Sequence, residues 1–243
     1  MRRNDSGAPA PLLGRQRRAG AVIGARQPAR KCGCAVAAGR GTIHGVEPGL
    51  VTGRLVLRRV TAADVDNLLA LDGDPEVMRY LEPRVKTRAQ IEAEVLPLFL
   101  GRYQRCPDFG RWAADARHSG DFVGWFGLRP VQPSDAAIVD WPDAPPGSGV
   151  AELGYRLRRS AWGRGYATEG ARALVRRAFG ELGVEEIVAT TMAVNAQSRA
   201  VLENAGLRHA RTVHLTWDEP LDGIEQGDVE YRLRREDWIA QAP

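Results

Sequence analysis

After position 53 the hydrophobic residues recur with two different periods, and the change of period predicts alternating strands and helices. Short runs of β-branched and aromatic residues predict seven strands. These runs cover residues 54–60, 109–116, 121–128, 150–157, 186–192, 207–217 and 229–233. Between them, hydrophobic residues at steps of three and four predict helices, of which the longest follows position 166. The pattern therefore predicts an α/β chain in the order strand, helices, three strands, helix, strand, helix and two strands.

Capping residues predict where the helices begin. Residues 61–64 (Thr-Ala-Ala-Asp) and 87–90 (Thr-Arg-Ala-Gln) both have the spacing of a capping box, in which two side chains bond each other's backbone N–H groups. Asp74 followed by proline predicts a further short helix, and Asn195 predicts the N-cap of the last long one. Pro97 should kink or divide the helix that follows position 90.

The first 48 residues differ in composition from the remainder of the 243-residue chain. They contain no Phe, Trp or Tyr, 12 of them are Gly or Pro, and nine basic against two acidic residues give them a net charge of +7. So few large apolar groups cannot offset the entropy lost on folding. We therefore predict a disordered basic tail over residues 1–48 and one folded domain over residues 49–243.

Charge and cysteine content exclude several classes of protein. The whole chain has a net charge of +4, but residues 49–243 have 25 basic and 28 acidic residues. The domain is therefore not expected to bind nucleic acid, and only weak contacts of the tail with polyanions are expected. The chain contains no run of about 18 apolar residues, so no membrane-spanning helix is predicted. Cys32, Cys34 and Cys106 cannot form a disulfide framework, and no second pair or histidine cluster completes a metal site, so a reducing cytoplasm and no bound metal are expected.

Residues 152–168 carry the clearest sign of a ligand site. A predicted strand leads into a loop with Gly163 and Gly165, and the loop leads into the longest helix. Glycine lets a ligand approach the backbone closely, and the first N–H groups of a helix attract anions. The arrangement suits a pyrophosphate, although a plain structural turn is the commoner meaning of such glycines. The P-loop sequence is absent, and Thr168 stands where the dinucleotide fingerprint has its third glycine.

Further motifs make this loop specific. Residues 162–167 (Trp-Gly-Arg-Gly-Tyr-Ala) resemble the acetyl-CoA loop of the GNAT acetyltransferase superfamily, usually written Gln/Arg-x-x-Gly-x-Gly/Ala. Trp162 replaces the usual Gln or Arg, which is typical of a branch similar to the ribosomal-protein N-terminal (alanine/serine) acetyltransferases. Motifs of that branch are also found at residues 152–155 (Glu-Leu-Gly-Tyr), 167–169 (Ala-Thr-Glu), 195–198 (Asn-Ala-Gln-Ser) and 201–207 (Val-Leu-Glu-Asn-Ala-Gly-Leu). Asn204 and Leu207 depart from the usual Lys and Phe, and the resemblance covers about residues 54–236.

This resemblance implies a fold and a co-substrate. The fold is a mixed, mostly antiparallel sheet of seven strands with helices on both faces, split in its centre between the strands that end near Leu157 and Val194. Acetyl-CoA would lie in the split, with its pantetheine amides along the first of these strands. The residues implied in its binding are Gly154, Tyr155, Arg156, Leu157, Arg159, Trp162, Gly163, Arg164, Gly165, Tyr166, Ala167, Thr168, Asn195 and Ser198. For Arg159 and Arg164 a solvated surface position is an equal alternative, and for Asn195 the alternative is a plain N-cap.

The resemblance also implies roles in acetyl transfer. An amine attacks the thioester carbonyl, and backbone N–H groups of residues 154–157 would stabilise the oxyanion. Many family members protonate the departing thiolate with a tyrosine, but Leu202 stands at that position. Ser198 is therefore the candidate, with a structural first-turn position as its alternative, and Tyr155 is a further catalytic candidate. Glu152 is the candidate general base, and a structural ion pair is its equal alternative.

The acceptor implied by the resemblance is a primary amine, first a protein or peptide N-terminal α-amino group and second a small amine such as an aminoglycoside or polyamine. A non-catalytic acyl-CoA-binding module is the alternative outside enzymes, and a homodimer is compatible with the family. Aromatic residues that could line the acceptor groove, or belong to the core, are Trp125, Trp141, Trp217 and Tyr231. Acidic residues that could attract a cationic acceptor, or form a solvated face, are Asp218, Glu219, Asp222, Glu225, Asp228 and Glu230.

Overall fold

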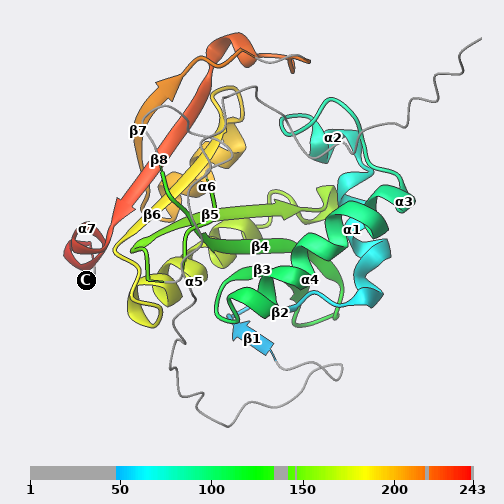
Figure 1. Cartoon of the computed structure of the whole chain (residues 1–243), viewed down its shortest axis with the longest axis horizontal. Helices are drawn as coiled ribbons and strands as arrows, with labels where there is room; N and C mark the ends of the chain where they lie inside the picture. The colour runs from blue at the N-terminus through cyan, green and yellow to red at the C-terminus, as the bar shows by residue number, and fades with distance from the viewer. Residues whose placement is uncertain (1–47, 134–141, 146, 217–218, 242–243) are drawn as a thin grey trace, which may run out of the picture.

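Strands from the whole length of the domain form one open sheet in the computed structural model, which describes residues 48–133, 142–145, 147–216 and 219–241. The strands are β1 (Pro48–Val51), β2 (Leu55–Arg59), β3 (Gly110–Ala116), β4 (Phe122–Pro130), β5 (Val150–Leu157), β6 (Glu186–Met192), β7 (Arg208–Val213) and β8 (Asp228–Arg234). Their order across the sheet is β1-β2-β3-β4-β5-β6-β8-β7. Every neighbouring pair is antiparallel except β5 and β6 (Figure 1). The predicted mixed, mostly antiparallel sheet is confirmed.

The sheet has one strand more than the sequence predicts. The additional strand is β1, which pairs antiparallel with β2 after a tight turn closed by a bond from the N–H of Thr52 to the carbonyl of Leu55 (2.9 Å). Only Leu50 and Val51 in this strand are large and apolar, so it is too short to give a periodic signal. Strand β1 begins at Pro48, the last residue assigned to the predicted tail, and residues 1–47 lie outside the described residues.

Helices cover both faces of the sheet, as expected. One face is covered by the helices that follow β2 and precede β3 in the sequence. These are α1 (Val65–Asp72), α2 (Pro75–Met78), α3 (Arg88–Gln90) and α4 (Leu96–Arg105). On the other lie α5 (Tyr166–Gly180) and α6 (Ala196–Asn204), and α7 (Arg235–Ala240) follows β8. Both capping boxes are present, at Thr61 and Thr87. Pro97 does not divide the predicted helix, because residues 88–105 are helical throughout. Pro97 lies in the first turn of α4, directly after a π-helical turn over Ile91–Val95.

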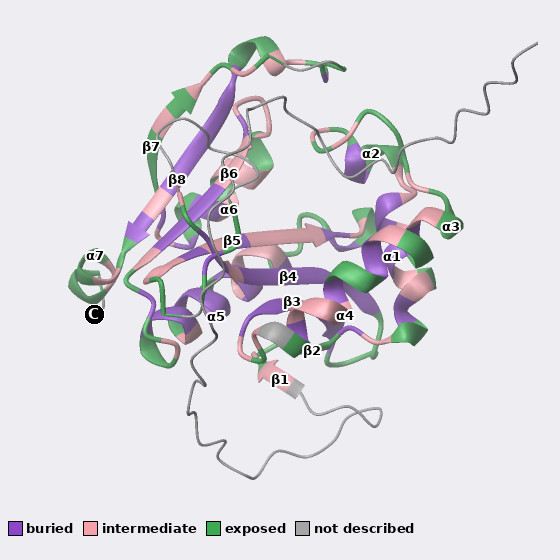
Figure 2. Cartoon of the chain, viewed as in Figure 1, coloured by how far each residue is buried: buried purple, intermediate pink, exposed green. Residues whose placement is uncertain are grey.

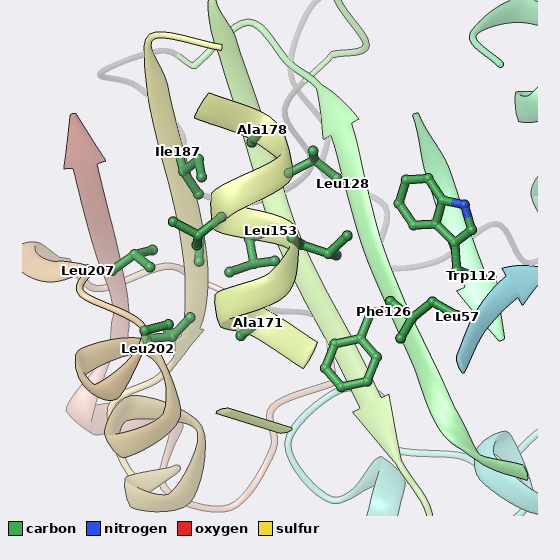
Figure 3. Packing of buried hydrophobic residues seen from close by; sticks show 14 of the residues in the cluster. Leu57, Trp112, Phe126, Leu128, Leu153, Ala171, Ala178, Ile187, Leu202 and Leu207 are labelled. Carbon is green, nitrogen blue, oxygen red and sulfur yellow. The ribbon is translucent and has the colours of Figure 1, made fainter. Parts of the chain in front are cut away.

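The larger core lies between α5 and the sheet. Apolar side chains of α5 pack against those of β2 to β6, as Figure 3 shows around Phe126 and Leu153. Gly170 of α5 lies directly against the Phe126 ring, since a Cβ at Gly170 would come within 2.3 Å of the ring Cζ. The predicted apolar face of α5 is buried (Figure 2). This packing holds the start of α5 close to the first half of β4 and the end of β5, which lie side by side.

A second core fixes the helices of the opposite face. Phe99 of α4 meets the Trp125 ring edge-on, with 5.8 Å between ring centroids. Leu68, Leu71 and Ile91 are fully or almost fully buried in the same cluster. Each such side chain contributes about 1.5–3 kcal/mol on burial. Trp125 is therefore held firmly on the face of the sheet opposite α5.

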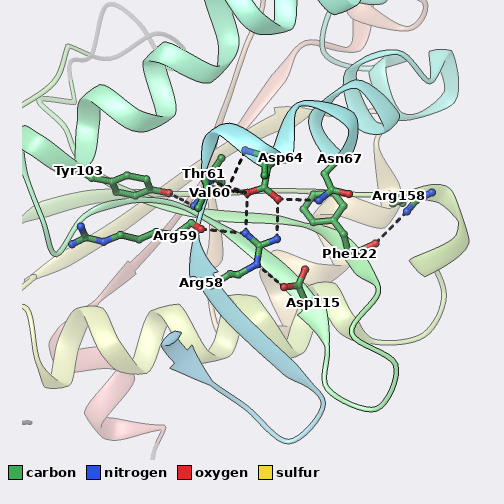
Figure 4. A network of polar contacts seen from close by, with 11 residues as sticks. Arg58, Arg59, Val60, Thr61, Asp64, Asn67, Tyr103, Asp115, Phe122 and Arg158 are labelled. Atoms are coloured by element: carbon green, nitrogen blue, oxygen red, sulfur yellow. Dashed lines mark hydrogen bonds and ion pairs between the residues drawn. The ribbon is translucent and has the colours of Figure 1, made fainter. Parts of the chain in front are cut away.

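A buried charge network ties β2 to the start of α1. Arg58 donates to both carboxylate oxygens of Asp64 at 2.8 Å, and its Nε donates to Asp115 at 2.7 Å (Figure 4). Asp64 also accepts from the N–H of Thr61 and the amide of Asn67. Asp64 and Asp115 are only 3 % and 7 % exposed, so the two carboxylates depend on the arginine between them.

Strands β5 and β6 separate after three residue pairs. Their parallel register joins residues 150–152 to residues 186–188 and ends there. Beyond it, β6 continues along β8 and residues 153–157 continue along β4. In Figure 1 the two strands point in different directions past this fork. The predicted central split is confirmed, and it leaves one edge of β5 without a strand partner in the described structure.

Some expectations fall on residues that the structure does not describe. Cys32 and Cys34 lie in the undescribed start of the chain, and Trp141, Trp217 and Asp218 lie in undescribed internal segments. The connection from β4 to β5 is described only in part. Within it, Val131 forms an isolated antiparallel bridge with Asp143, which places the Asp143 side chain close to the end of β4.

Candidate active site

A cavity of about 940 Å³ lies where β5 and β6 separate. Strand β5, the loop before α5 and the first turns of α5 and α6 form one part of its lining. The predicted binding residues that line it are Gly154, Tyr155, Arg156, Leu157, Trp162, Gly163, Gly165, Tyr166, Ala167, Thr168, Asn195 and Ser198. Arg159 and Arg164 belong to the same predicted set but are not among the lining residues. The structure thus brings most of the predicted set to one place.

Backbone amides at the start of α5 lie on this cavity without helix partners. Gly163 and Gly165 have φ angles of +69° and +77°, which residues with a Cβ rarely adopt. Gly165 is the N-cap of α5, and no side chain caps the helix there. The first helix bond runs from the N–H of Glu169 to the carbonyl of Gly165 (3.1 Å), so the N–H groups of residues 166–168 make none. Free amides and the positive end of a helix dipole suit an anionic ligand such as a pyrophosphate.

Glu169 fastens this loop to the hairpin of β1 and β2. Its carboxylate accepts hydrogen bonds from the Thr52 hydroxyl (2.6 Å), the Arg54 N–H (2.7 Å) and the Arg54 Nε (2.6 Å). Arg54 also donates to the carbonyl of Arg164 at 2.8 Å and lies over the Tyr166 ring. Burial acts to raise the pKa of Glu169, but these hydrogen bonds outweigh it and lower the pKa. The turn between β1 and β2 therefore helps to hold the loop that contains Gly163 and Gly165.

Trp162 closes the other side of the loop. Its indole N–H donates to the carbonyl of Leu157 at 2.8 Å, which joins the end of β5 to the loop before α5. Arg159 is 61 % exposed in its side chain and lies 3.6 Å from Asp74, which is the position expected of a solvated arginine. Arg164 lies over the Tyr166 ring, with 5.2 Å from its guanidinium carbon to the ring centroid.

Two hydroxyl groups meet where β5 faces α6. The phenol oxygen of Tyr155 lies 3.0 Å from the Ser198 hydroxyl and 3.0 Å from the Ser198 carbonyl oxygen. Asn195 accepts a hydrogen bond from the Ser198 N–H at 3.1 Å, so the predicted N-cap is confirmed. Burial raises the pKa of Tyr155 above its usual value, more than the hydrogen bond with Ser198 lowers it. The phenol is therefore protonated at neutral pH and can pass a hydrogen bond to an anion through Ser198.

Glu152 lines the cavity and is also ion-paired. One of its carboxylate oxygens accepts a hydrogen bond from Nε of Arg129. Arg129 in turn bonds Asp143 at 3.1 Å, and Asp143 bonds Arg102 at 2.8 Å. The structural ion pair that the sequence leaves open for Glu152 is therefore present. The side chain also lines the cavity, and its role as general base stays a prediction.

The other part of the lining comes from residues that the sequence analysis did not select. They are Tyr80 and Leu81 after α2, Leu98 and Arg102 on α4, and Arg111 on β3. Trp125 also lines this part, which we call the acceptor part, and at 8 % exposure it belongs to the second core as well. No motif links these residues, because they come from four separate elements that only the fold brings together. Tyr231, in contrast, is fully buried and donates to Glu203 at 2.7 Å, so it belongs to the core.

The acidic run near the C-terminus is not one solvated face, so that expectation is wrong for two of its members. Glu230 is fully buried between Arg211 and Arg232, and Asp228 is 3 % exposed. Both lie on β8, which is an interior strand between β6 and β7. Glu219 is exposed and pairs with Arg84 at 2.7 Å. The described members of this run therefore do not form a continuous acidic surface for a cationic acceptor, although Asp228 lines the cavity.

The described ranges contain no group of three or more His, Cys, Asp or Glu side chains placed to hold a metal ion. Over the same ranges, no helix is both long enough and apolar enough to cross a membrane.

Comparison with known families matches residues 54–208 to the model of the acetyltransferase (GNAT) domain. Over 193 residues the chain is 36 % identical to an FsC-acetyl coenzyme A-N(2)-transacetylase of Aspergillus fumigatus, and the match covers 79 % of each chain. It is also 25 % identical over 161 residues to YoaA, an uncharacterized N-acetyltransferase of Bacillus subtilis, covering 66 % of this chain and 83 % of that one.

Solved structures share the same fold. An acetyltransferase of the GNAT family from Bacillus anthracis superposes with a TM-score of 0.61 at 19 % identity, over 79 % of this chain and 98 % of that one. RimL, a ribosomal alpha-N-protein acetyltransferase in complex with coenzyme A, gives 0.61 at 18 % identity, over 77 % and 98 %. A spermidine N-acetyltransferase from Vibrio cholerae in complex with CoA and spermine gives 0.58 at 15 % identity, over 77 % and 99 %. At these identities the likeness concerns the fold alone.

Proposed function

Since the chain belongs to the GNAT acetyltransferase family and is an N-acetyltransferase, we propose that it transfers an acetyl group from acetyl-CoA to an α-amino group by direct attack on the thioester. The observation that carries the proposal is the open edge of β5 beside the free amides at the start of α5, both on one cavity. A pantetheine arm can pair with that edge as an added strand, and the diphosphate can bind at residues 163–168. The fold leaves unpaired the groups that this co-substrate needs.

Three tasks in the transfer then fall to residues of this chain. Free N–H groups on the open edge of residues 154–157 donate to the carbonyl oxygen, where negative charge develops. The N–C bond forms, the C–S bond breaks, and the hydroxyl pair of Tyr155 and Ser198 donates a hydrogen bond to the departing thiolate. The proton of the amine passes through water to Glu152, whose other oxygen remains with Arg129.

Glu152→Gln should lower kcat about 100-fold, at the low end for general-base catalysis because a water lies between base and amine. The amide keeps the size of the side chain but cannot accept the proton. The measurement is kcat at saturating acetyl-CoA, compared between the variant and the wild type. The KM for acetyl-CoA should change little.

Arg129→Gln is the matched control for Glu152. It breaks the same ion pair but leaves the carboxylate in the cavity. If the ion pair alone matters, both variants lose the same activity, and the assignment of Glu152 as the base is wrong. If Glu152 is the base, Arg129→Gln keeps most of kcat.

The proposed function itself is tested by release of the CoA thiol from acetyl-CoA in the presence of candidate acceptors. The panel contains peptides with different N-terminal residues, free amino acids and their derivatives, polyamines and aminoglycosides. We expect compounds with an α-amino group to be acetylated, since the curated relative at 36 % identity is named for transfer to an N(2) nitrogen. Acetylation of polyamines or aminoglycosides alone would contradict the α-amino assignment. No thiol release with any acceptor would contradict the proposed function.

A further inference from the structure

Arg111 is a cation in the acceptor part of the cavity that no carboxylate of the described residues neutralises. Its guanidinium carbon lies 4.9 Å from the centroid of the Phe99 ring and 5.1 Å from that of the Trp125 ring. These contacts hold the group in place, but an aromatic face does not replace the oxygen acceptors that five N–H donors require. Within the described ranges, no oxygen accepts a hydrogen bond from this guanidinium.

The three arginines around Arg111 are each paired with a carboxylate. The pairs are Arg156 with Asp72, Arg102 with Asp143 (2.8 Å), Arg129 with Asp143 (3.1 Å) and Arg129 with Glu152. Among the described residues, this cluster of four arginines thus meets three carboxylates. The unbalanced positive charge lies on Arg111.

The surroundings of Arg111 lower the pKa of its guanidinium, but the group stays positively charged. Burial, and then the positive charges of Arg102, Arg156 and Arg129, outweigh the attraction of Glu152 and lower the pKa of Arg111 to about 10. The side chain is therefore still protonated at neutral pH. A bound anion would offset the repulsion from the neighbouring arginines.

Beside Arg111 the sheet has a recess floored by glycine. Arg111 on β3 lies opposite Gly127 on β4, and Gly127 lies opposite Gly154 on β5. The stem of Arg111 crosses over Gly127, since a Cβ at Gly127 would come within 3.1 Å of Arg111 Cγ. A Cβ at Gly154 would meet nothing closer than the Trp125 ring at 3.7 Å. A pocket of about 90 Å³ lies over these glycines and is also lined by Arg102, Arg129 and Glu152.

We propose that this recess binds a carboxylate of the acceptor, so that the acceptor is a small molecule with both an amine and a carboxylate, as in an amino acid. The inference rests on the proposed function. A guanidinium and a carboxylate pair through two parallel hydrogen bonds, which fixes orientation as well as position. Gly154 lies on the strand whose open edge faces the β5–β6 fork, and Glu152 lies two residues earlier on the same face of the sheet. A carboxylate held at Arg111 therefore leaves the amine beside β5 and near the proposed base.

The test compares matched acceptors that differ only in the carboxylate. Free amino acids and their carboxamides are assayed by thiol release with acetyl-CoA. In the wild-type protein, kcat/KM should be about 10- to 100-fold higher for the free acids, because a charge-assisted hydrogen bond is lost in the amide. Arg111→Gln should remove this preference, mainly by raising the KM for the free acids. Arg111→Lys should keep part of it, because the charge remains and the paired hydrogen bonds do not.

Arg176→Gln is the matched control, because Arg176 is an exposed arginine on the outer side of α5. It should keep the preference for free acids. The KM for acetyl-CoA should be the same in wild type, Arg111→Gln and Arg176→Gln, which shows that the variants are folded. Equal kcat/KM for acids and amides in the wild type would overturn the inference while leaving the proposed function intact.

Two further arms separate the other outcomes. Binding of N-acetyl amino acids and of their amides, in the presence of CoA, is measured by calorimetry and does not depend on turnover. Preferred binding of the acids that is lost in Arg111→Gln supports the inference even if the proposed function fails, and equal binding overturns it. Succinyl-CoA is compared with acetyl-CoA as donor. A preference for succinyl-CoA that Arg111→Gln removes would assign the carboxylate to the acyl group and overturn the inference for the acceptor.

Discussion

Replacing Gly165 by valine is expected to lower kcat/KM for acetyl-CoA by about 10³-fold, the effect of losing two charge-assisted hydrogen bonds. Gly165 has a φ of +77°, and a Cβ there would come within 3.2 Å of the Arg54 guanidinium. A β-branched residue is strained in this conformation and would displace Arg54 from its bonds with Glu169 and the Arg164 carbonyl. The amides of residues 166–168 would then be both shifted and covered. The measurement is the KM for acetyl-CoA together with CoA binding by calorimetry.

Gly183→Val is the control that distinguishes the effect of backbone strain from the effect of blocking the binding site. Gly183 has a φ of +65°, and no atom lies within 4 Å of its would-be Cβ, so valine is strained there without blocking anything. Gly183→Val should lose about 1–3 kcal/mol of stability through backbone strain, and Gly165→Val should lose that amount together with the contribution of the Arg54 bonds. Only Gly165→Val should lose affinity for CoA. Equal affinity for CoA in the two variants would show that the start of α5 does not bind the diphosphate.

Features that depend on neighbours in sequence could be predicted from the chain alone. The capping box at Thr61 needs only residues three apart, and the loop glycines at 163 and 165 need only a strand before them and a helix after them. The apolar face of α5 follows from its period. The split between β5 and β6 came from the family resemblance, and it places most of the predicted binding residues on one cavity.

Features that depend on strand register could not be predicted. The ion pair of Glu152 with Arg129 exists because β4 and β5 place these residues opposite each other. Arg111, Gly127 and Gly154 form a row across three strands, and nothing in the sequence around any one of them shows it. The burial of Glu230 likewise follows from the place of β8 between β6 and β7, which a run of acidic residues in the sequence conceals.

The substitution with the largest expected effect on stability is Arg58→Met, which should lower the free energy of unfolding at pH 7 by about 3–5 kcal/mol. Methionine fills much of the space but leaves Asp64 and Asp115 without the cation that pairs with both. Denaturant unfolding at pH 7 measures the loss. Arg88→Met is the control, because Arg88 and its partner Asp66 are exposed, and it should leave the free energy of unfolding almost unchanged.

The pH dependence of the loss identifies its cause. Burial acts to raise the pKa of Asp64, but the hydrogen bonds from Arg58, Thr61 and Asn67 outweigh it and lower the pKa to about 2. Because the folded pKa lies below the unfolded value near 3.9, the pairing stabilises the wild type fully above about pH 4 and is lost as the pH falls through about 2. In Arg58→Met the buried carboxylates lose their unpaired charge when they are protonated. The difference in free energy of unfolding between variant and wild type should therefore become smaller below pH 4. If this difference in free energy of unfolding is the same at pH 7 and pH 3, Arg58 contributes through packing of its stem and not through its charge.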